Sequence, residues 1–172
     1  MELGDKSFTP QEPLLIDKIN GTLKMLGSTM KWKRAPEVIK GAEVLKDKKI
    51  AMVDDEQGVL ESFVPDLMTA TDGKAAFIKY EGQSIDELTK QIQDAEADLV
   101  LLDYHLSEVL KGSDVARALT DNGFSGDMVG FSSDPGAASD FKKEGALGSV
   151  DKKAWSPEDS VEQLAQLLNN KR

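Results

Sequence analysis

Cysteine is absent from the 172-residue chain, and its absence excludes several classes of site. Disulfide bonds, thiolate metal centres and cysteine nucleophiles cannot form, which suits a reducing cytoplasm. Long apolar runs are also missing, since none approaches the roughly 18 residues that span a membrane. The N-terminus lacks a basic segment followed by an apolar core, which is the pattern of a secretion signal. We therefore expect a cytoplasmic protein without a membrane segment.

Positive charge is scarce in most of the chain, which has a formal charge of −10. Residues 1–48 hold nine Lys and Arg against seven Asp and Glu, whereas residues 49–172 hold twelve against twenty-four. Nucleic acid is therefore not an expected ligand of the acidic part, because phosphate backbones bind to Lys and Arg. Basic proteins and metal cations are better candidates. With 40% apolar residues the chain can bury one substantial core, so we expect one domain with an extension.

The first part of the chain predicts a helical extension. Residues 1–13 contain two prolines and little apolar content, and we expect a poorly ordered leader there. Residues 13–30 then show the period of one helix face, with apolar side chains at Leu15, Ile19, Leu23, Leu26 and Met30. Such a helix must lie against its own domain, a partner or a second copy of the chain, so a homodimer is possible. We divide the chain into this extension, 1–47, and a second unit, 48–172.

A basic cluster, Lys31-Trp32-Lys33-Arg34, follows the predicted helix. One interpretation is a docking patch for an acidic surface or nucleic acid. The other is a solvated helix end whose cations lie near the negative end of the helix dipole. The second is the more common reason for such a cluster, and we favour it.

From residue 49 the pattern alternates between short apolar strands and amphipathic helices. Strands are expected at 49–53, 75–80, 99–102, 127–131 and 148–150. Each is followed by a helix signal: the apolar stripe of Val59, Leu60, Phe63 and Leu67, the cap Ser84, the start at Gly112, the segment 135–143, and the cap Ser156 before Pro157. Five such units predict a doubly wound parallel sheet of five strands with helices on both faces.

Polar side chains gather where these strands end. Asp54 and Asp55 follow the first strand, Asp103 the third, Ser132 the fourth and Lys152 the fifth. A lone Asp at a strand end is most simply a turn residue, but here all five groups would face one crevice at the switch point of the sheet. Three crowded carboxylates stay ionised only beside a cation, and ligands that are all oxygen favour Mg²⁺. A lysine and a serine opposite such an ion suit a ligand with phosphoryl oxygens.

These residues, in this order, resemble the receiver domain of two-component response regulators. The resemblance covers residues 49–168 and is carried by four motifs: the paired acids in 52–56, the lone Asp in 99–103, the hydroxyl in 131–133 and the Lys in 145–152. It implies a flavodoxin-like (βα)5 fold with an N-terminal helical extension. No single motif is specific, but four in the family's order and at about its spacing form a strong signal.

The resemblance also implies roles for the site residues. Asp103 would be the phosphoacceptor, taking a phosphoryl group from the phosphohistidine of a histidine kinase or a histidine phosphotransfer protein. Ser132 would hydrogen-bond a phosphoryl oxygen, and Lys152 would pair with another. Such a domain is not an enzyme, except that it catalyses its own phosphorylation and dephosphorylation. Its output would be the switching of an unknown partner.

The same resemblance implies how Mg²⁺ would be held. Asp55 and Asp103 would contact the ion directly, Asp54 would contact it through water, and the backbone carbonyl of His105 would complete the protein ligands. His105 is the only histidine of the chain. We expect an exposed loop histidine whose backbone binds, rather than a catalytic imidazole.

Several positions depart from the family pattern. Lys153 stands where a proline commonly follows the conserved lysine, so the loop must be held in another way. Ser149 stands where an aromatic residue often acts as a rotamer switch, and residues 106–107 replace a common Met-Pro pair. We therefore expect intact chemistry with an altered read-out. His105 and Asp134, two places after Asp103 and Ser132, lie where side chains can influence attack of water on an acyl phosphate.

Two other functions remain open. The chain could be a pseudoreceiver, an interaction module that works without phosphorylation, although the intact acids and Lys152 argue against this. It could instead be a Mg²⁺-dependent phosphohydrolase of the haloacid dehalogenase type. That family places its nucleophile in an Asp-x-Asp pair on the first strand, and Asp54-Asp55-Glu56 does not supply this spacing.

Overall fold

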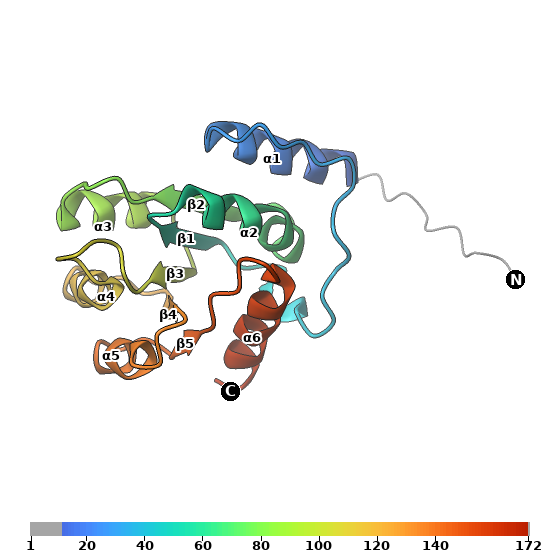
Figure 1. The fold of residues 1–172 in the computed structure, drawn as a ribbon. Helices are drawn as coiled ribbons and strands as arrows, with labels where there is room; N and C mark the ends of the chain where they lie inside the picture. Colours follow the sequence, from blue (N-terminus) through green and yellow to red (C-terminus); the bar gives the residue numbers. More distant parts are fainter. Residues whose placement is uncertain (1–11, 172) are drawn as a thin grey trace, which may run out of the picture.

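The computed structural model describes residues 12–171, which form a parallel sheet with helices on both of its faces (Figure 1). The predicted leader lies almost entirely outside these residues. The sheet has five strands in the order β2-β1-β3-β4-β5. Their bounds are β1 Ile50–Asp54, β2 Ala75–Lys79, β3 Leu99–Asp103, β4 Asp127–Phe131 and β5 Ser149–Val150. All neighbouring strands pair in parallel, which confirms the predicted flavodoxin-like arrangement.

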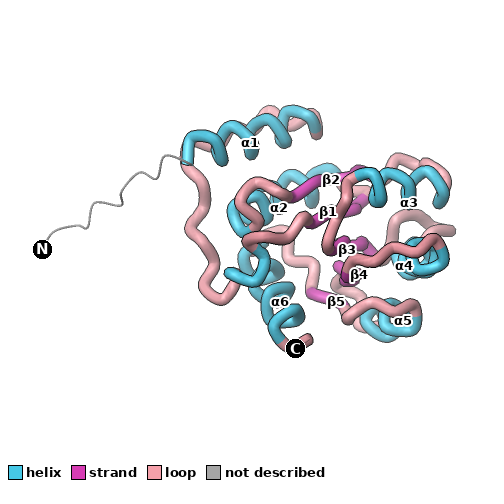
Figure 2. Tube along the Cα trace, turned by 180° about the vertical axis from the view of Figure 1, so that it is seen from behind, coloured by secondary structure: helices cyan, strands magenta, loops and turns pink. Residues whose placement is uncertain are grey.

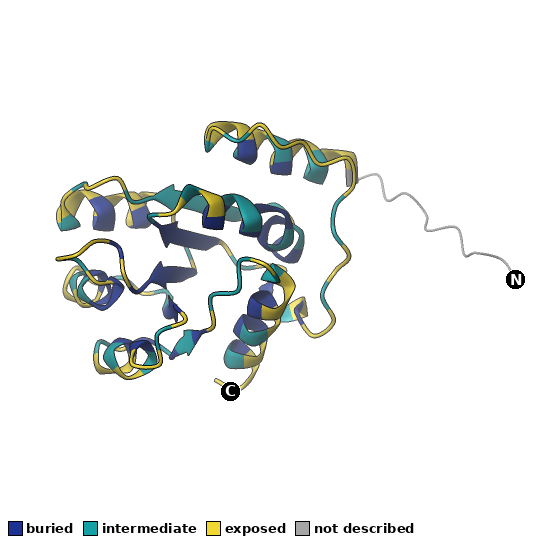
Figure 3. Cartoon of the chain, in the orientation of Figure 1, coloured by how far each residue is buried: buried dark blue, intermediate teal, exposed yellow. Residues whose placement is uncertain are grey.

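Two layers of helices enclose the sheet. On one face lie α2 (Gln57–Ala70) and α6 (Pro157–Asn169), and on the other lie α3 (Ile85–Asp94), α4 (Gly112–Asp121) and α5 (Ala137–Lys143), as Figures 1 and 2 show from opposite sides. Each face has its own apolar core. Figure 3 shows the strands of the sheet largely buried between the two layers.

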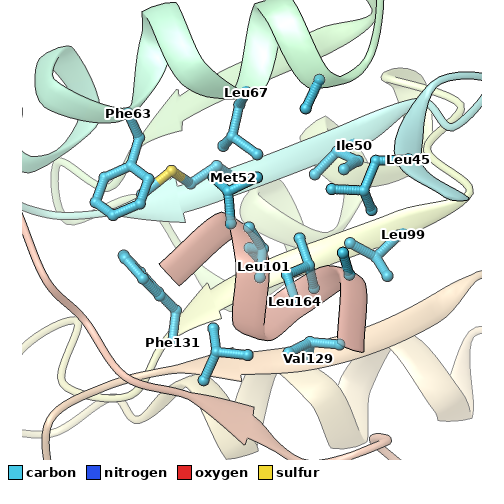
Figure 4. Close-up of a cluster of buried hydrophobic side chains, with 14 of the residues drawn as sticks. Leu45, Ile50, Met52, Phe63, Leu67, Leu99, Leu101, Val129, Phe131 and Leu164 are labelled. Atoms are coloured by element: carbon cyan, nitrogen blue, oxygen red, sulfur yellow. The ribbon is translucent and has the colours of Figure 1, made fainter. Parts of the chain in front are cut away.

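The central strand β3 explains the apolar run in the sequence. All five of its residues are buried, because β1 and β4 flank it and helices cover both of its faces. Leu99 and Leu101 join the core beneath α2 and α6 (Figure 4), whereas Val100 and Leu102 join the core on the opposite face. A strand with two apolar faces needs continuous rather than alternating apolar residues.

Helix starts agree with the sequence in one case and differ in another. The Ser84 hydroxyl accepts the Glu87 N–H at 3.2 Å, and the Glu87 carboxylate accepts the Ser84 N–H at 3.1 Å, so the predicted cap is confirmed as a capping box. Ser156 precedes α6 as expected, but its side chain does not cap the helix. Its hydroxyl donates to the Glu158 carboxylate at 2.9 Å instead.

The extension helix ends before the last apolar residue of the pattern that predicted it. Helix α1 spans Glu12–Met25 and does not reach Met30, which is 45% exposed. Gly27 ends it with a φ of 83°, a left-handed conformation that glycine adopts without strain. The Ser28 N–H donates to the Leu23 carbonyl at 2.9 Å and closes the last turn. The prediction of a helix to residue 30 was therefore wrong.

Helix α1 lies against its own chain rather than standing free. Ile19 and Leu23 are fully buried and form a small core with Val64 and Met68 of α2. Figures 1 and 3 show α1 above α2, with its buried side facing the sheet domain. The boundary between 47 and 48 stays a prediction, although Leu45 of the short helix η1 (Glu43–Leu45) packs into the same core as β1.

The basic cluster does not end a helix. Residues 31–34 follow the end of α1 by several residues and lie in the segment that returns along it, so the helix-dipole interpretation was wrong. The side chain of Asn20 on α1 holds this segment, accepting the Trp32 N–H at 2.8 Å and donating to the Trp32 carbonyl at 2.9 Å.

Among the described residues, no helix is both long and apolar enough to cross a membrane.

Asp66 of α2 is a partly buried carboxyl group that lies near Glu158 of α6, so its titration reports on the packing of these two helices. Burial, together with the negative charge of Glu158, raises the pKa of Asp66 to about 6. The folded chain thus holds this proton more tightly than the unfolded chain does. Its contribution to the free energy of unfolding is fully present below pH 4 and is lost as the pH rises through 6.

We predict that Asp66→Asn raises the free energy of unfolding at pH 7 by about 1 to 3 kcal/mol and has little effect at pH 4. Urea unfolding at both pH values measures this difference. Glu162→Gln, an exposed change on α6, serves as the control. An Asp66→Asn gain of equal size at both pH values would contradict the assignment.

Candidate functional site

The carboxyl ends of the parallel strands bring the predicted site residues to one edge of the sheet. Asp54 ends β1 and Asp103 ends the neighbouring β3. Val53 pairs with Leu102 in the register of these strands, so the two acids follow at the same level. On the other side of β3, Asp103 pairs with Phe131, so Ser132 follows at the same level. Phe131 pairs in turn with Val150, two residues before Lys152.

Three carboxylates form a cluster at this edge. Asp54, Asp55 and Asp103 each offer an oxygen atom, and these oxygens all lie within 4.8 Å of one another. Asp54 is completely buried and Asp103 is 3% exposed, while Asp55 is more open. The structure thus brings together the acids that the sequence predicts.

Lys152 supplies the positive charge of the cluster. Its Nζ lies 2.7 Å from Oδ2 of Asp54 and 3.3 Å from Oδ1 of Asp103, and its side chain is 14% exposed. Oδ1 of Asp54 accepts the Glu56 N–H at 2.8 Å. The buried Oδ2, despite its close ion pair, has no well-directed hydrogen bond among the described residues.

Burial dominates the electrostatics of the cluster. Desolvation raises the pKa of Asp54 and of Asp103 above the ordinary aspartate value, and the charge of Asp54 raises that of Asp103 further. Burial alone would lower the pKa of Lys152, but hydrogen bonding and charge from Asp54 and Asp103 raise it above its usual range. One ammonium group therefore faces three carboxyl groups, which leaves an excess of negative charge.

This donor set fits a hard divalent cation. All three side chains offer carboxylate oxygens, the ligand type that Mg²⁺ and Ca²⁺ prefer. Oδ2 of Asp54 is buried without a well-directed donor, and a hydrogen bond from the protonated Asp103 carboxyl group to Asp55 contributes to the raised pKa of Asp103. A bound cation would place positive charge beside these carboxyl groups and would favour their ionised forms.

Ser132 and His105 lie in the loops around this cluster. Ser132 is buried, and its hydroxyl accepts the Asp134 N–H at 3.0 Å. The His105 ring is 60% exposed, as expected, and its Nε2 lies 3.0 Å from Oδ2 of Asp134. This contact joins the loop after β3 to the loop after β4. The metal-binding role of the His105 carbonyl stays a prediction.

Sequence analysis missed Tyr104, which directly follows Asp103. Tyr104 is 4% exposed, and its ring packs against Phe141 of α5 with ring centroids 5.9 Å apart. Its hydroxyl donates a hydrogen bond to Asp140 of α5 and lies 3.4 Å from Nζ of Lys111. The position next to the predicted phosphoacceptor was the only signal in the sequence, because Asp140 lies 36 residues away.

The loop that carries Lys152 is held by α6. Lys153, which occupies the position where the family commonly has proline, donates its N–H to the Ser160 hydroxyl at 3.1 Å. The same hydroxyl donates to the Asp151 carbonyl at 2.6 Å. The Asp151 N–H donates to the Gln163 side chain at 3.0 Å, one turn further along α6. The loop is thus fixed by side chains of α6.

Comparisons with known proteins show the fold. No protein-family model matches the chain, and no curated protein matches its sequence. The receiver domain of the histidine kinase CKI1 from Arabidopsis thaliana, complexed with Mg²⁺ and BeF3⁻, aligns with a TM-score of 0.56 and 18% identity. That alignment covers 77% of this chain and 95% of that chain.

Two further structures agree. A DNA-binding response regulator of the LuxR family from Staphylococcus aureus aligns with a TM-score of 0.53 and 16% identity, over 72% of this chain and 97% of that chain. The BeF3-activated DrrB receiver domain aligns with a TM-score of 0.53 and 20% identity, over 71% and 97%. The sheet order, the two helical layers and these alignments together show that the chain has the fold of a response regulator receiver domain.

Proposed function

We propose that this chain is a phosphoacceptor domain of a two-component or phosphorelay system. One observation carries the proposal: Lys152 contacts both Asp54 and Asp103 in a buried carboxylate cluster at the edge of the sheet. The phosphoryl donor would be the phosphohistidine of a histidine kinase or a histidine phosphotransfer protein. A cytoplasmic location, the output partner and a homodimer remain predictions.

The reaction would proceed at the Asp103 carboxylate. One carboxylate oxygen attacks the phosphorus atom, an O–P bond forms, and the N–P bond of the phosphohistidine breaks. The imidazole nitrogen keeps the electron pair of that bond. Asp103 sits at the end of a fully buried strand, so its backbone is held in place and its side chain would lose little conformational entropy when the donor binds.

The surrounding groups would stabilise the charge of the transferred phosphoryl group. Lys152 already lies 3.3 Å from Asp103 and can pair with one phosphoryl oxygen, while the buried Ser132 hydroxyl can donate to another. Asp55 and Asp103 would hold Mg²⁺ directly and Asp54 would hold it through water. The bound ion would neutralise phosphoryl charge.

The switch would act through α5. The usual aromatic residue of the fifth strand is replaced by Ser149, whereas Tyr104 reaches α5 from the residue next to Asp103. Any shift of the loop after β3 on phosphorylation would therefore act on α5 through Asp140. Helix α5 has only seven residues, so a single side-chain tether can influence its position.

Phosphorylation itself is the first test. We predict that acetyl phosphate with Mg²⁺ adds one phosphoryl group to the chain and none to Asp103→Asn, as measured by intact mass. Glu108→Gln, an exposed change in the loop after β3, should react like the wild type. If the wild type gains no phosphoryl group, the chain is better described as a pseudoreceiver.

Binding of Mg²⁺ provides a second test. We predict that Mg²⁺ raises the midpoint of thermal unfolding of the wild type, because it binds only the folded cluster. Asp55→Asn should weaken Mg²⁺ binding at least about tenfold while leaving the metal-free midpoint unchanged or higher, since it relieves repulsion. Calorimetric titration and thermal scans measure both effects. Mg²⁺ binding to Asp55→Asn with wild-type affinity would exclude this ligand set.

The Tyr104 tether provides a third test. We predict that BeF3⁻ with Mg²⁺ changes amide hydrogen exchange in α5 of the wild type, and that Tyr104→Phe reduces this change at least about threefold. Ser139→Ala removes an exposed hydroxyl from the same helix and serves as the control. An undiminished change in Tyr104→Phe would mean that the signal leaves the site by another route.

A further inference from the structure

We infer that Ser160 of α6 is a positioning residue that sets where the Lys152 ammonium group lies. The inference rests on the proposed phosphoacceptor function, because it assigns Ser160 a part in that same reaction. It starts from the two hydrogen bonds of one buried hydroxyl, which is 2% exposed.

The Ser160 hydroxyl contacts the backbone on both sides of Lys152. It donates to the carbonyl of Asp151 at 2.6 Å and accepts the N–H of Lys153 at 3.1 Å. A hydroxyl is one donor and one acceptor in one atom, so a serine can bridge a carbonyl and an N–H that face the same point. The backbone of Lys152 is thereby clamped between two fixed neighbours.

Helix α6 is a firm support for this clamp. Val161 and Leu164 are buried in the core with β3 and β4, so the helix cannot move without disturbing that core. Ser160 precedes this apolar stripe by one residue and points its hydroxyl at the loop after β5. Strand β5 has only two residues, so the sheet alone gives the loop little support.

The clamp matters because the Lys152 ammonium group must reach two carboxylates at once. Its Nζ lies 2.7 Å from Asp54 and 3.3 Å from Asp103. A lysine side chain has four rotatable bonds, so a loosely held backbone would spread the ammonium group over many positions. If the ammonium group is already in place, the entropy cost of ordering it does not add to the barrier of the transfer step.

Lys153 is the other half of the arrangement. The Ser160 hydroxyl needs an N–H at position 153, and any residue except proline supplies one. The residue that departs from the family pattern is therefore the residue that lets α6 hold the loop. Lys153 also forms an ion pair with Asp159 of α6 at 3.9 Å, and its side chain is about one-third exposed.

The test separates the position of Lys152 from the binding of the metal. In the full chain, Ser160→Ala should slow phosphorylation by acetyl phosphate at least about fivefold, while Mg²⁺ affinity stays within about twofold of wild type. The acids that would bind Mg²⁺ are untouched, so a loss confined to phosphoryl transfer points to Lys152. Ser160→Thr keeps the hydroxyl and should restore at least half of the wild-type rate.

Ser156→Ala is the matched control. It removes a hydroxyl at the start of the same helix, one that contacts Glu158 rather than the loop. Thermal scans confirm that each variant is folded at the assay temperature. A wild-type rate in folded Ser160→Ala, or equal losses in rate and Mg²⁺ affinity, would overturn the inference. A wild type that is not phosphorylated at all would instead refute the proposed function.

Discussion

The site depends on two like charges that the sheet forces together. Asp54 and Asp103 end adjacent parallel strands, both are buried, and burial raises both of their pKa values. Such a pair is costly to keep ionised unless positive charge lies beside it. Lys152 provides one positive charge, and a divalent cation held with Asp55 would provide the rest.

The strands and the acids at their ends could be predicted because each depends on local sequence. A run such as Leu99–Leu102 has few alternatives to a strand buried on both faces, and parallel strands place their carboxyl ends together in any order. The end of α1 could not be predicted from the apolar period, which continues through Met30 although Gly27 turns the chain back. Ser156 has the right residue type for a cap, but its hydroxyl bonds to Glu158.

Two contacts beside the site that the sequence did not predict join side chains far apart in the chain. Tyr104 meets Asp140 across 36 residues, and His105 meets Asp134 across 29. Such pairs depend on how the loop after β3 packs against α5 and the loop after β4, which no local pattern encodes. They also share a place in the molecule, since each tethers a loop around the carboxylate cluster. The backbone of the sheet thus fixes the acids, while side chains from outside the sheet fix the loops. Two of the departures from the family pattern, residues 106–107 and Lys153, fall in these loops, and the third, Ser149, lies in the short strand β5.

Locating the phosphoryl group on the chain would show whether Asp103 is the phosphoacceptor. After reaction with a small phosphodonor and Mg²⁺, borohydride reduces an aspartyl phosphate to an alcohol, and peptide mass spectrometry identifies the altered residue. We predict modification at one position, Asp103, and we expect this modification to require Mg²⁺ and to be absent when Mg²⁺ is chelated. Modification of Asp54 or Asp55 instead, or of a surface carboxylate with no dependence on Mg²⁺, would contradict this prediction.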